Sequence, residues 1–409
     1  MQWPGEDMLA FRKDHFENYL EWAFDQGASD ILLESGERVG MIKDGYVRDA
    51  GNKILRFEEL IGILSEVYQP ASQSLLKSAK DLNFAYSLLR ENDEIIRFRV
   101  NATAVQPSGG AESGLEIVLR TIPGVVPHYK DLDLPEEVIS ASKAEFGIVL
   151  VTGPTGSGKS TSAVAMIRDI AEQKPININT YESPIEFDLK SIPNRLARIK
   201  QTEIPTGLED YNVAVANSLR RAQKVVFFGE ARQKEIFEAC IREAETGHMV
   251  LTTVHANDVP STISRITGEF SATQARAIES KLAGTLRLIL NQRLYPKRGG
   301  GRVAIREYLV FTDEMRRHLQ MSTLKPGMFN QEVMQLVNSA GVSMLSDATR
   351  HFKSGVLPLV QFASIVNEVG SIKDLDIIPE VAESLRDSNV IDPDEFGEWI
   401  REYEALRKP

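Results

Sequence analysis

Apolar residues near the start of the chain recur first with helical and then with strand-like spacing. Phe16, Tyr19, Leu20, Ala23 and Phe24 fall on one face of an amphipathic helix. A second helix is predicted over 57–68, and strands are predicted over 31–33, 95–105 and 115–121. Asp44-Gly45 is a hairpin signal, and 106–111 has the composition of a hairpin loop. Residues 1–121 are therefore expected to form a small α+β domain.

The pattern changes after a segment with three prolines, 122–135, which we interpret as a linker. Apolar runs then predict strands at 148–152, 176–182, 224–229, 249–255 and 302–311. Helical patterns lie between them, for example Val164, Ile167, Ile170 and Ala171. Strands that alternate with helices indicate a mostly parallel sheet with helices on both faces.

The end of the chain is predicted to be helical from about Gly341 onward. In its last segment, Phe396, Trp399, Ile400 and Tyr403 share one face, which we expect to pack on the main body rather than on a separate partner. The expected organisation is an α+β domain at 1–121, a linker at 122–135, an α/β domain at 136–355 and a helical C-terminal extension at 356–409.

A phosphate-binding motif follows the first strand of the α/β domain. It reads Gly153-Pro154-Thr155-Gly156-Ser157-Gly158-Lys159-Ser160, and Thr161 continues it into a helical pattern. Glycines allow backbone N–H groups to surround phosphate oxygens, and the start of the helix favours negative charge. Lys159 is expected to reach the β- and γ-phosphates, and the Ser160 hydroxyl to bind Mg²⁺. The sequence therefore predicts a site for a nucleoside triphosphate.

Acidic residues and histidines accompany the next three predicted strands. Glu182 ends the first, Glu230 follows the apolar run of the second, and His248 and His255 flank the third. A carboxylate after a strand is usually a solvated turn, and a lone histidine is more often structural than catalytic. Because strand ends in a parallel sheet gather at the ligand-binding edge, we expect these side chains beside the phosphate-binding motif.

Composition restricts the other possibilities. The 409-residue chain has a net charge of −11, which argues against broad nucleic-acid binding by its whole surface. Its single cysteine, Cys240, has helical spacing with apolar neighbours and is expected to be a buried thiol, and one cysteine excludes a four-cysteine zinc site within the chain. The N-terminus lacks a signal-peptide pattern, and no apolar run reaches the roughly 20 residues that span a bilayer. We expect a cytoplasmic protein that reaches the inner membrane only peripherally, through partners.

The order of these elements resembles the type II/type IV secretion ATPase superfamily, over about residues 16–355. Its members carry a Walker A box, an Asp box, a Walker B box and a His box in this order, which here correspond to 153–160, 181–186, 225–232 and 243–255. Further matches are Ala28-Ser29-Asp30, Arg97-Phe98-Arg99-Val100-Asn101, Leu119-Arg120-Thr121-Ile122-Pro123 and Gly299-Gly300-Gly301-Arg302-Val303-Ala304 with Glu307.

The resemblance implies a PAS-like N-terminal domain, a RecA-like ATPase domain and a ring of six identical subunits that hydrolyses ATP with Mg²⁺. It implies that Glu230 organises the metal, together with Ser160. Glu182 would orient or deprotonate the attacking water, although the division of labour between the two acids stays open. His248 and His255 would sense the γ-phosphate or relay its loss between subunits. Arg99 and Arg120 would complete the site, the alternative for both being a surface salt bridge.

Several positions depart from the family pattern. Ser183 replaces the usual aspartate of the Asp box, and Ala222-Gln223-Lys224 replaces an acidic lead-in to the Walker B strand. The interval from Arg99 to Arg120 is lengthened by residues 107–114, and the extension past about Gly355 has no counterpart in shorter members. None of these departures removes the essential lysine, glutamates or histidines.

The sequence also favours one branch of the superfamily. The single cysteine argues against the assembly ATPases that carry a zinc module. The box at 180–186, the segment 201–205 and Ser218-Leu219-Arg220-Arg221 resemble the DotB-like branch, which serves type IVB secretion and conjugation. A PilT-like retraction motor of type IV pili is the second hypothesis. Either would act with inner-membrane apparatus proteins.

Two hypotheses of a different class are a nucleotide-binding ring that does not hydrolyse ATP and a RecA-like nucleic-acid motor. Retention of both glutamates and both histidines speaks against the first. The second lacks an aromatic-plus-basic binding stretch, so direct nucleic-acid binding is not expected.

Overall fold

The structure is a computed structural model that describes residues 3–4, 9–43, 46–78, 81–91, 94–106, 114–122, 124–204, 207–218, 220–322 and 328–406. The hairpin signal Asp44-Gly45, most of the loop at 106–111 and of the lengthened interval at 107–114, and Pro123, Pro205 and Leu219 of the family-like motifs lie outside these residues. Contacts divide the chain into two compact units. Unit 1 contains Met1–Val126 and Pro184–Ser191, and unit 2 contains Pro127–Ser183 and Ile192–Pro409. The predicted linker, 122–135, spans this division.

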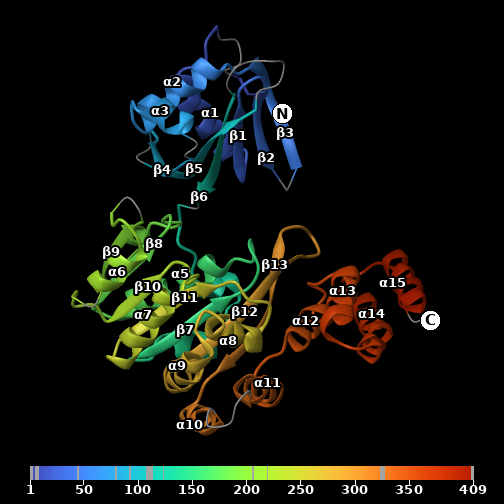
Figure 1. Ribbon diagram of the computed structural model, residues 1–409. Helices are drawn as coiled ribbons and strands as arrows, with labels where there is room; N and C mark the ends of the chain where they lie inside the picture. Colours follow the sequence, from blue (N-terminus) through green and yellow to red (C-terminus); the bar gives the residue numbers. More distant parts are fainter. Residues whose placement is uncertain are drawn as a thin grey trace. The chain divides into compact units, whose positions relative to one another are not determined.

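Unit 1 is a six-stranded antiparallel sheet with helices packed against it (Figure 1). The strand order is β3-β2-β1-β6-β5-β4. Its elements are α1 (Lys13–Asp25), β1 (Asp30–Glu34), β2 (Arg38–Lys43), β3 (Tyr46–Ile54), α2 (Phe57–Val67), α3 (Ser72–Lys77), β4 (Leu82–Leu89), β5 (Ile95–Val105), β6 (Gly114–Ile122) and the short 3₁₀ helix η3 (Leu189–Ser191). Phe16, Tyr19, Leu20 and Ala23 of α1 are buried in its core, which confirms the predicted helical stripe.

Unit 2 is built on a seven-stranded sheet with the order β13-β12-β7-β11-β10-β8-β9. All neighbouring strands are parallel except β12 and β13. The strands are β7 (Gly147–Thr152), β8 (Asn177–Glu182), β9 (Arg198–Glu203), β10 (Val225–Phe228), β11 (Met249–Val254), β12 (Leu286–Pro296) and β13 (Arg302–Val310). Four of the five inner strands, β7, β8, β10 and β11, are almost completely buried, as expected for a sheet covered on both faces.

Helices cover this sheet on both faces (Figure 1). One layer contains η2 (Tyr129–Leu132), α4 (Glu136–Ser142) and α5 (Lys159–Gln173). The other contains α6 (Tyr211–Ser218), α7 (Lys234–Glu245), α8 (Val259–Thr267), α9 (Ala272–Thr285), α10 (Asp313–Ser322) and α11 (Met328–Ala340). The α/β class with a mostly parallel sheet is therefore confirmed.

The C-terminal extension forms a helical cluster beside β13 (Figure 1). The extension, 356–409, supplies α13 (Leu359–Val369), η4 (Ile372–Ile377), α14 (Ile378–Asp387) and α15 (Pro393–Leu406). The preceding helix α12 (Met344–Lys353) belongs to the same cluster, although it lies before the predicted start of the extension. Trp399 is buried in the apolar core of this cluster, and Phe396, Ile400 and Tyr403 pack against it. The last helix therefore packs within the chain, as predicted. Among the described residues, none of the helices combines the length and apolar character that crossing a membrane would require.

Candidate functional site

The phosphate-binding motif forms a loop between the buried strand β7 and the helix α5. Gly153, Gly156 and Gly158 have φ angles of 142°, 76° and 81°, a region that favours glycine. Lys159 is 8% exposed, and its ammonium donates hydrogen bonds to the carbonyl oxygens of Gly153 at 3.0 Å and Pro154 at 2.8 Å. Lys159 therefore spans the loop at the start of α5.

The rest of the loop is arranged like an anion cradle. Ser157 is 3% exposed, and its Oγ forms no hydrogen bond with any described residue. A buried hydroxyl without a partner is available for a hydrogen bond with a polar ligand. Ser160 and Thr161 occupy the first turn of α5, where hydroxyl groups and free N–H groups are available to phosphate oxygens. These residues fit a bound nucleotide phosphate.

Glu182 lies at the carboxyl end of β8 and is only 3% exposed. Its Oε1 accepts hydrogen bonds from Thr180 Oγ1 at 2.6 Å and from Gln201 Nε2 at 3.1 Å. A Cβ atom on Gly229 would come within 3.3 Å of the Glu182 Cα, so glycine allows the end of β10 to approach this carboxylate closely. Two hydrogen bonds therefore hold the Glu182 side chain in one orientation.

Glu230 follows β10 at the same edge of the sheet. Its Oε1 lies 2.6 Å from Arg232 Nε and 2.9 Å from His255 Nε2, although neither contact has the angles of a hydrogen bond. His255 follows β11, and its pKa depends on the charge of Lys159 as well as on that of Glu230. Burial lowers the pKa of His255, the positive charge of Lys159 lowers it further, and the Glu230 carboxylate opposes both. The structure thus brings Lys159, Glu230 and His255 together.

Tyr211, at the start of α6, is influenced by the charges of both carboxylates. Its place at the site was not predicted from the sequence. Burial raises the pKa of its phenol, and the negative charges of Glu182 and Glu230 raise it further. Tyr211 therefore stays protonated near neutral pH and can donate a hydrogen bond. Nothing in its local sequence distinguishes it from an ordinary core tyrosine, since its partners belong to other strands.

Strand β12 supplies two further residues that sequence reasoning missed. Gln292 is 2% exposed and donates from Nε2 to the Ser157 carbonyl at 2.6 Å. Asn291 is fully buried and donates from Nδ2 to Thr152 Oγ1 at 2.9 Å and to the Ala256 carbonyl at 3.0 Å. Both side chains contact loops at the carboxyl edge of the sheet.

His248 does not share this site within its own chain, which corrects the expectation that it would lie beside the phosphate-binding loop. It precedes β11, and its carbonyl accepts a hydrogen bond from the N–H of Gly147, the first residue of β7. At about 3.3 Å per residue, a strand of this length separates the two edges by roughly 20 Å. Its Nδ1 lies 3.1 Å from Oε2 of the buried Glu243.

Arg99 and Arg120 belong to unit 1. They occupy opposite positions on β5 and β6, and both are exposed. Arg120 donates from Nε to Asp30 Oδ1 at 2.9 Å, so the salt bridge considered for this residue does form. Among the residues that the structure describes, Arg99 has no ion pair. Each arginine presents a cation on the surface of this unit.

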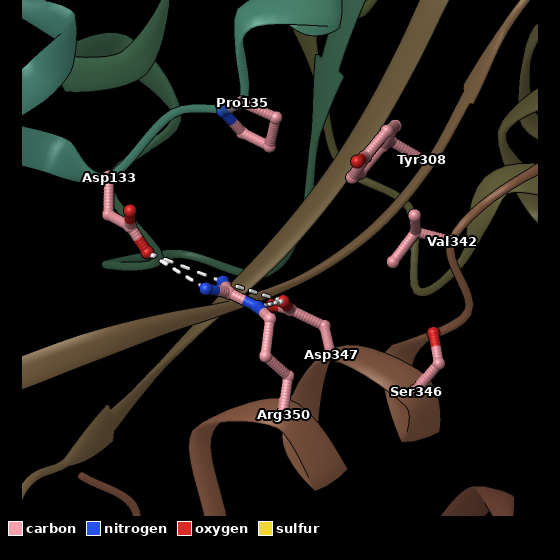
Figure 2. Close-up of a pocket in the computed structure, with 7 residues that line it drawn as sticks. All are labelled: Asp133, Pro135, Tyr308, Val342, Ser346, Asp347 and Arg350. Carbon is pink, nitrogen blue, oxygen red and sulfur yellow. Dashed lines mark hydrogen bonds and ion pairs between the residues drawn. The ribbon is translucent and has the colours of Figure 1, made fainter. Parts of the chain in front are cut away.

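A pocket of about 430 Å³ lies in another part of unit 2 (Figure 2). In it, Arg350 of α12 pairs with Asp133 at 3.3 Å and with Asp347 at 2.9 Å. The buried Arg306 of β13 donates to the Asp133 carbonyl at 2.8 Å. These contacts fasten the end of the predicted linker to β13 and α12. The pocket contains none of the residues predicted for nucleotide binding or catalysis.

A glycine-rich loop between a buried parallel strand and a helix, with carboxylates on neighbouring strand ends, defines a P-loop nucleotide-binding domain. Residues 9–361 match the model of the family described as "Type II/IV secretion system protein". The chain belongs to this family.

Individual relatives agree with this assignment. The chain is 32% identical over 297 residues to the type IV pilus retraction ATPase PilT of Pseudomonas aeruginosa, which covers 73% of this chain and 83% of that protein. The structure of the Legionella pneumophila ATPase DotB has a TM-score of 0.80 and 34% identity, covering 90% of this chain and 99% of that one. A structure of the pilus retraction motor PilT with bound ADP has a TM-score of 0.73 and 30% identity, covering 85% and 96%.

Together these findings make the chain a secretion-family ATPase similar to DotB and PilT. It is a nucleotide-binding enzyme that hydrolyses ATP with a P-loop.

Proposed function

We propose that the chain forms a homo-hexameric motor that hydrolyses ATP to drive a type IVB secretion or conjugation apparatus. The observation that carries the chemical part is the meeting of Lys159, Glu182, Glu230 and His255 at the carboxyl edge of one sheet. The likeness to the DotB structure, which extends over nearly all of that chain, supports the choice of apparatus.

The loop binds the phosphates of ATP. The Lys159 ammonium exchanges its two carbonyl contacts for β- and γ-phosphate oxygens, and the Ser157 hydroxyl gains the partner that it lacks. Ser160 and Glu230 offer hydroxyl and carboxylate oxygens, the donors that Mg²⁺ prefers. When bound, Mg²⁺ supplies positive charge that offsets the charge of the phosphates.

Glu182 orients the attacking water and accepts its proton. The water oxygen forms a bond to the γ-phosphorus, while the bond from that phosphorus to the bridging oxygen breaks and ADP leaves. The hydrogen bonds from Thr180 and Gln201 fix the Glu182 carboxylate before the reaction, so no reorientation is needed. We assign Glu230 to the metal side because its carboxylate already pairs with Arg232 and His255.

His255 detects the γ-phosphate, because it contacts Glu230 and senses the charge of Lys159. Arg99 and Arg120 of unit 1 stabilise the charge of the transition state, as arginines do in other P-loop enzymes. We place them in the site of a neighbouring subunit, so that hydrolysis changes the contact between subunits. His248, at the opposite edge of the sheet, is available for a relay between subunits.

Phosphate release by the purified protein tests the chemistry. We expect Mg²⁺-dependent release of phosphate from ATP by the wild type and only background release by Lys159→Ala. Equal background release by both would refute the hydrolase mechanism, and would favour a passive nucleotide-binding ring.

Retraction of a type IV pilus is the second candidate function, which the similarity to PilT favours. A deletion strain complemented with wild type or Lys159→Ala distinguishes the two. We expect the strain complemented with Lys159→Ala to lose conjugal transfer or secretion but to keep surface motility. Loss of surface motility alone would assign the protein to pilus retraction.

A further inference from the structure

Three consecutive residues of β12 contact four separate parts of unit 2. Asn291 contacts the end of β7 and the loop after β11, Gln292 contacts the phosphate-binding loop, and Arg293 contacts α13. Because side chains alternate along a strand, Gln292 faces one side of the sheet while its two neighbours face the other. Side chains of this strand therefore contact the loop of Lys159 on one face of the sheet and the loop of His255 on the other.

The Gln292 amide uses both of its ends. Its Nε2 donates to the Ser157 carbonyl at 2.6 Å, and its Oε1 accepts from the Ser162 hydroxyl of α5 at 2.8 Å. One side chain thus joins the phosphate-binding loop to the first turn of the helix that follows it. Both hydrogen bonds are buried, so water cannot easily replace either of them.

The backbone of Gln292 adds a second restraint. A Cβ atom on Gly153 would lie 2.3 Å from the Gln292 carbonyl oxygen, which is too close for any side chain. The first glycine of the loop is therefore packed directly against this strand. Gln292 touches the loop near its beginning, at Gly153, and near its end, at Ser157.

Asn291 extends the connection to the opposite face of β12. Its Nδ2 bonds Thr152, the residue immediately before the loop, and the carbonyl of Ala256, the residue immediately after His255. The position of the His255 loop is therefore linked through β12 to the position of the phosphate-binding loop.

We propose that Gln292 is a positioning residue for nucleotide binding, which holds the N–H groups of the phosphate-binding loop in their phosphate-binding orientation. It acts through Ser157 and Ser162 and does not touch the nucleotide. This inference rests on the proposed function. It assigns a role in nucleotide binding to Gln292, which lies outside the phosphate-binding motif.

A purely structural role is the alternative, and the chain offers a matched control for it. Gln223 is also buried, at 3% exposure, and its amide likewise uses both ends. Its Nε2 donates to the Ser218 carbonyl at 2.5 Å and its Oε1 accepts from Asn179 at 2.6 Å. It precedes β10 and therefore lies at the amino edge of the sheet, away from the phosphate-binding loop.

The test compares ADP binding, measured by titration calorimetry, in Gln292→Met and Gln223→Met. Both changes remove a buried amide of the same kind, so both lower the thermal midpoint of the nucleotide-free protein. We expect Gln292→Met to weaken ADP binding by about 10- to 100-fold, because small displacements of a binding group have effects of this size. Gln223→Met is expected to stay within about threefold of the wild type, since its contacts lie elsewhere.

Gln292→Glu keeps the shape and the acceptor for Ser162 but removes the donor to Ser157. It is expected to weaken ADP binding as well, whereas Ser162→Ala, which leaves the Ser157 contact intact, is expected to have a smaller effect. Wild-type ADP affinity in folded Gln292→Met or Gln292→Glu would overturn the proposal, as would equal weakening in Gln223→Met.

ADP binding is measured without turnover, so the result is independent of hydrolysis. If the wild type binds ADP but releases no phosphate from ATP, the proposed function fails while the role of Gln292 can still be decided. If Gln292 variants bind ADP normally in a protein that hydrolyses ATP, only the positioning role fails.

Discussion

Arg99 and Arg120 stand directly opposite one another on the antiparallel strands β5 and β6. Side chains in such a pair share one face of the sheet, and like charges in this arrangement are destabilising. Asp30, opposite Arg120 on β1, offsets one of the two charges through its 2.9 Å contact. Because this pair of cations does not stabilise its own sheet, the arrangement favours a role in which the two arginines contact an anion outside unit 1.

Arg99→Ala therefore tests whether this pair acts in catalysis. We expect turnover to fall about 100-fold or more, the effect of losing a transition-state donor, while ATP affinity changes only a few-fold. Arg48→Ala, which removes an exposed arginine from β3 of the same sheet, is the control. Steady-state phosphate release and equilibrium nucleotide binding measure the two quantities. Equal loss of both in Arg99→Ala would contradict the assignment.

The two carboxylates should be separable by isosteric substitution. Because Glu182 is held by Thr180 and Gln201, Glu182→Gln fits the same space and should keep nucleotide affinity. Turnover is expected to fall about 10²- to 10⁴-fold, the range for loss of a general base. Glu230→Gln should instead raise the Mg²⁺ concentration needed for half-maximal rate.

Glu145→Gln provides the control for these measurements, since Glu145 is exposed just before β7, at the opposite edge of the sheet. Interchanged phenotypes, with Glu182→Gln altering the Mg²⁺ requirement, would reverse the roles of the two acids.

Much of the candidate site can be predicted from local sequence patterns. The strand, loop and helix around Lys159 are recognisable because the pattern is contiguous and strongly periodic. Glu182 and Glu230 were expected at the strand ends, and the parallel register of β8 and β10 explains why they meet. These parts of the site depend on residues close in sequence or on the general geometry of parallel sheets.

Strand β12 could not be predicted from its local sequence. In its middle it carries Asn291, Gln292 and Arg293, polar residues that are typical of a surface segment, and no strand was predicted there. The first two are buried because their hydrogen-bond partners, such as Thr152 and Ser157, lie far away in the chain. His248 was misplaced for a related reason, since a histidine beside a strand does not reveal at which edge of the sheet it lies.

Glu307 predicts a pH dependence of stability. Its Oε1 accepts a 2.6 Å hydrogen bond from the Val259 N–H at the start of α8. Burial and the charge of Asp258 nevertheless raise its pKa above the ordinary 4.5, against the hydrogen bonds from Val259 and Met344. A raised carboxyl pKa stabilises the folded state fully below about pH 4.5, and this contribution is lost as pH rises through the folded-state pKa.

Glu307→Gln removes this titration but keeps an oxygen for Val259. Its stability relative to the wild type should therefore rise between pH 5 and pH 8, as measured by urea midpoints. Glu91→Gln, at an exposed position, is the control. A relative stability that falls over this range would contradict the sign of the predicted shift.

Cys240, the only cysteine of the chain, should be unreactive in the folded protein. It is 2% exposed in α7, and burial together with the charge of Glu243 raises the pKa of its thiol. Since the thiolate is the reactive form, a chromogenic disulfide reagent at pH 8 should label it only after unfolding. Rapid stoichiometric labelling of the native protein would show that α7 is more open than the structure indicates.

The central claim is that each active site combines the phosphate-binding loop of one subunit with the arginines of its neighbour. Phosphate release by oligomers co-assembled from Lys159→Ala and Arg99→Ala subunits, purified through two different tags, tests it most directly. In a head-to-tail ring of randomly mixed subunits, about a quarter of the sites receive an intact loop and intact arginines. We predict that the mixed oligomers hydrolyse ATP well above either variant alone. Co-purified mixed oligomers no more active than the separate variants would contradict the claim.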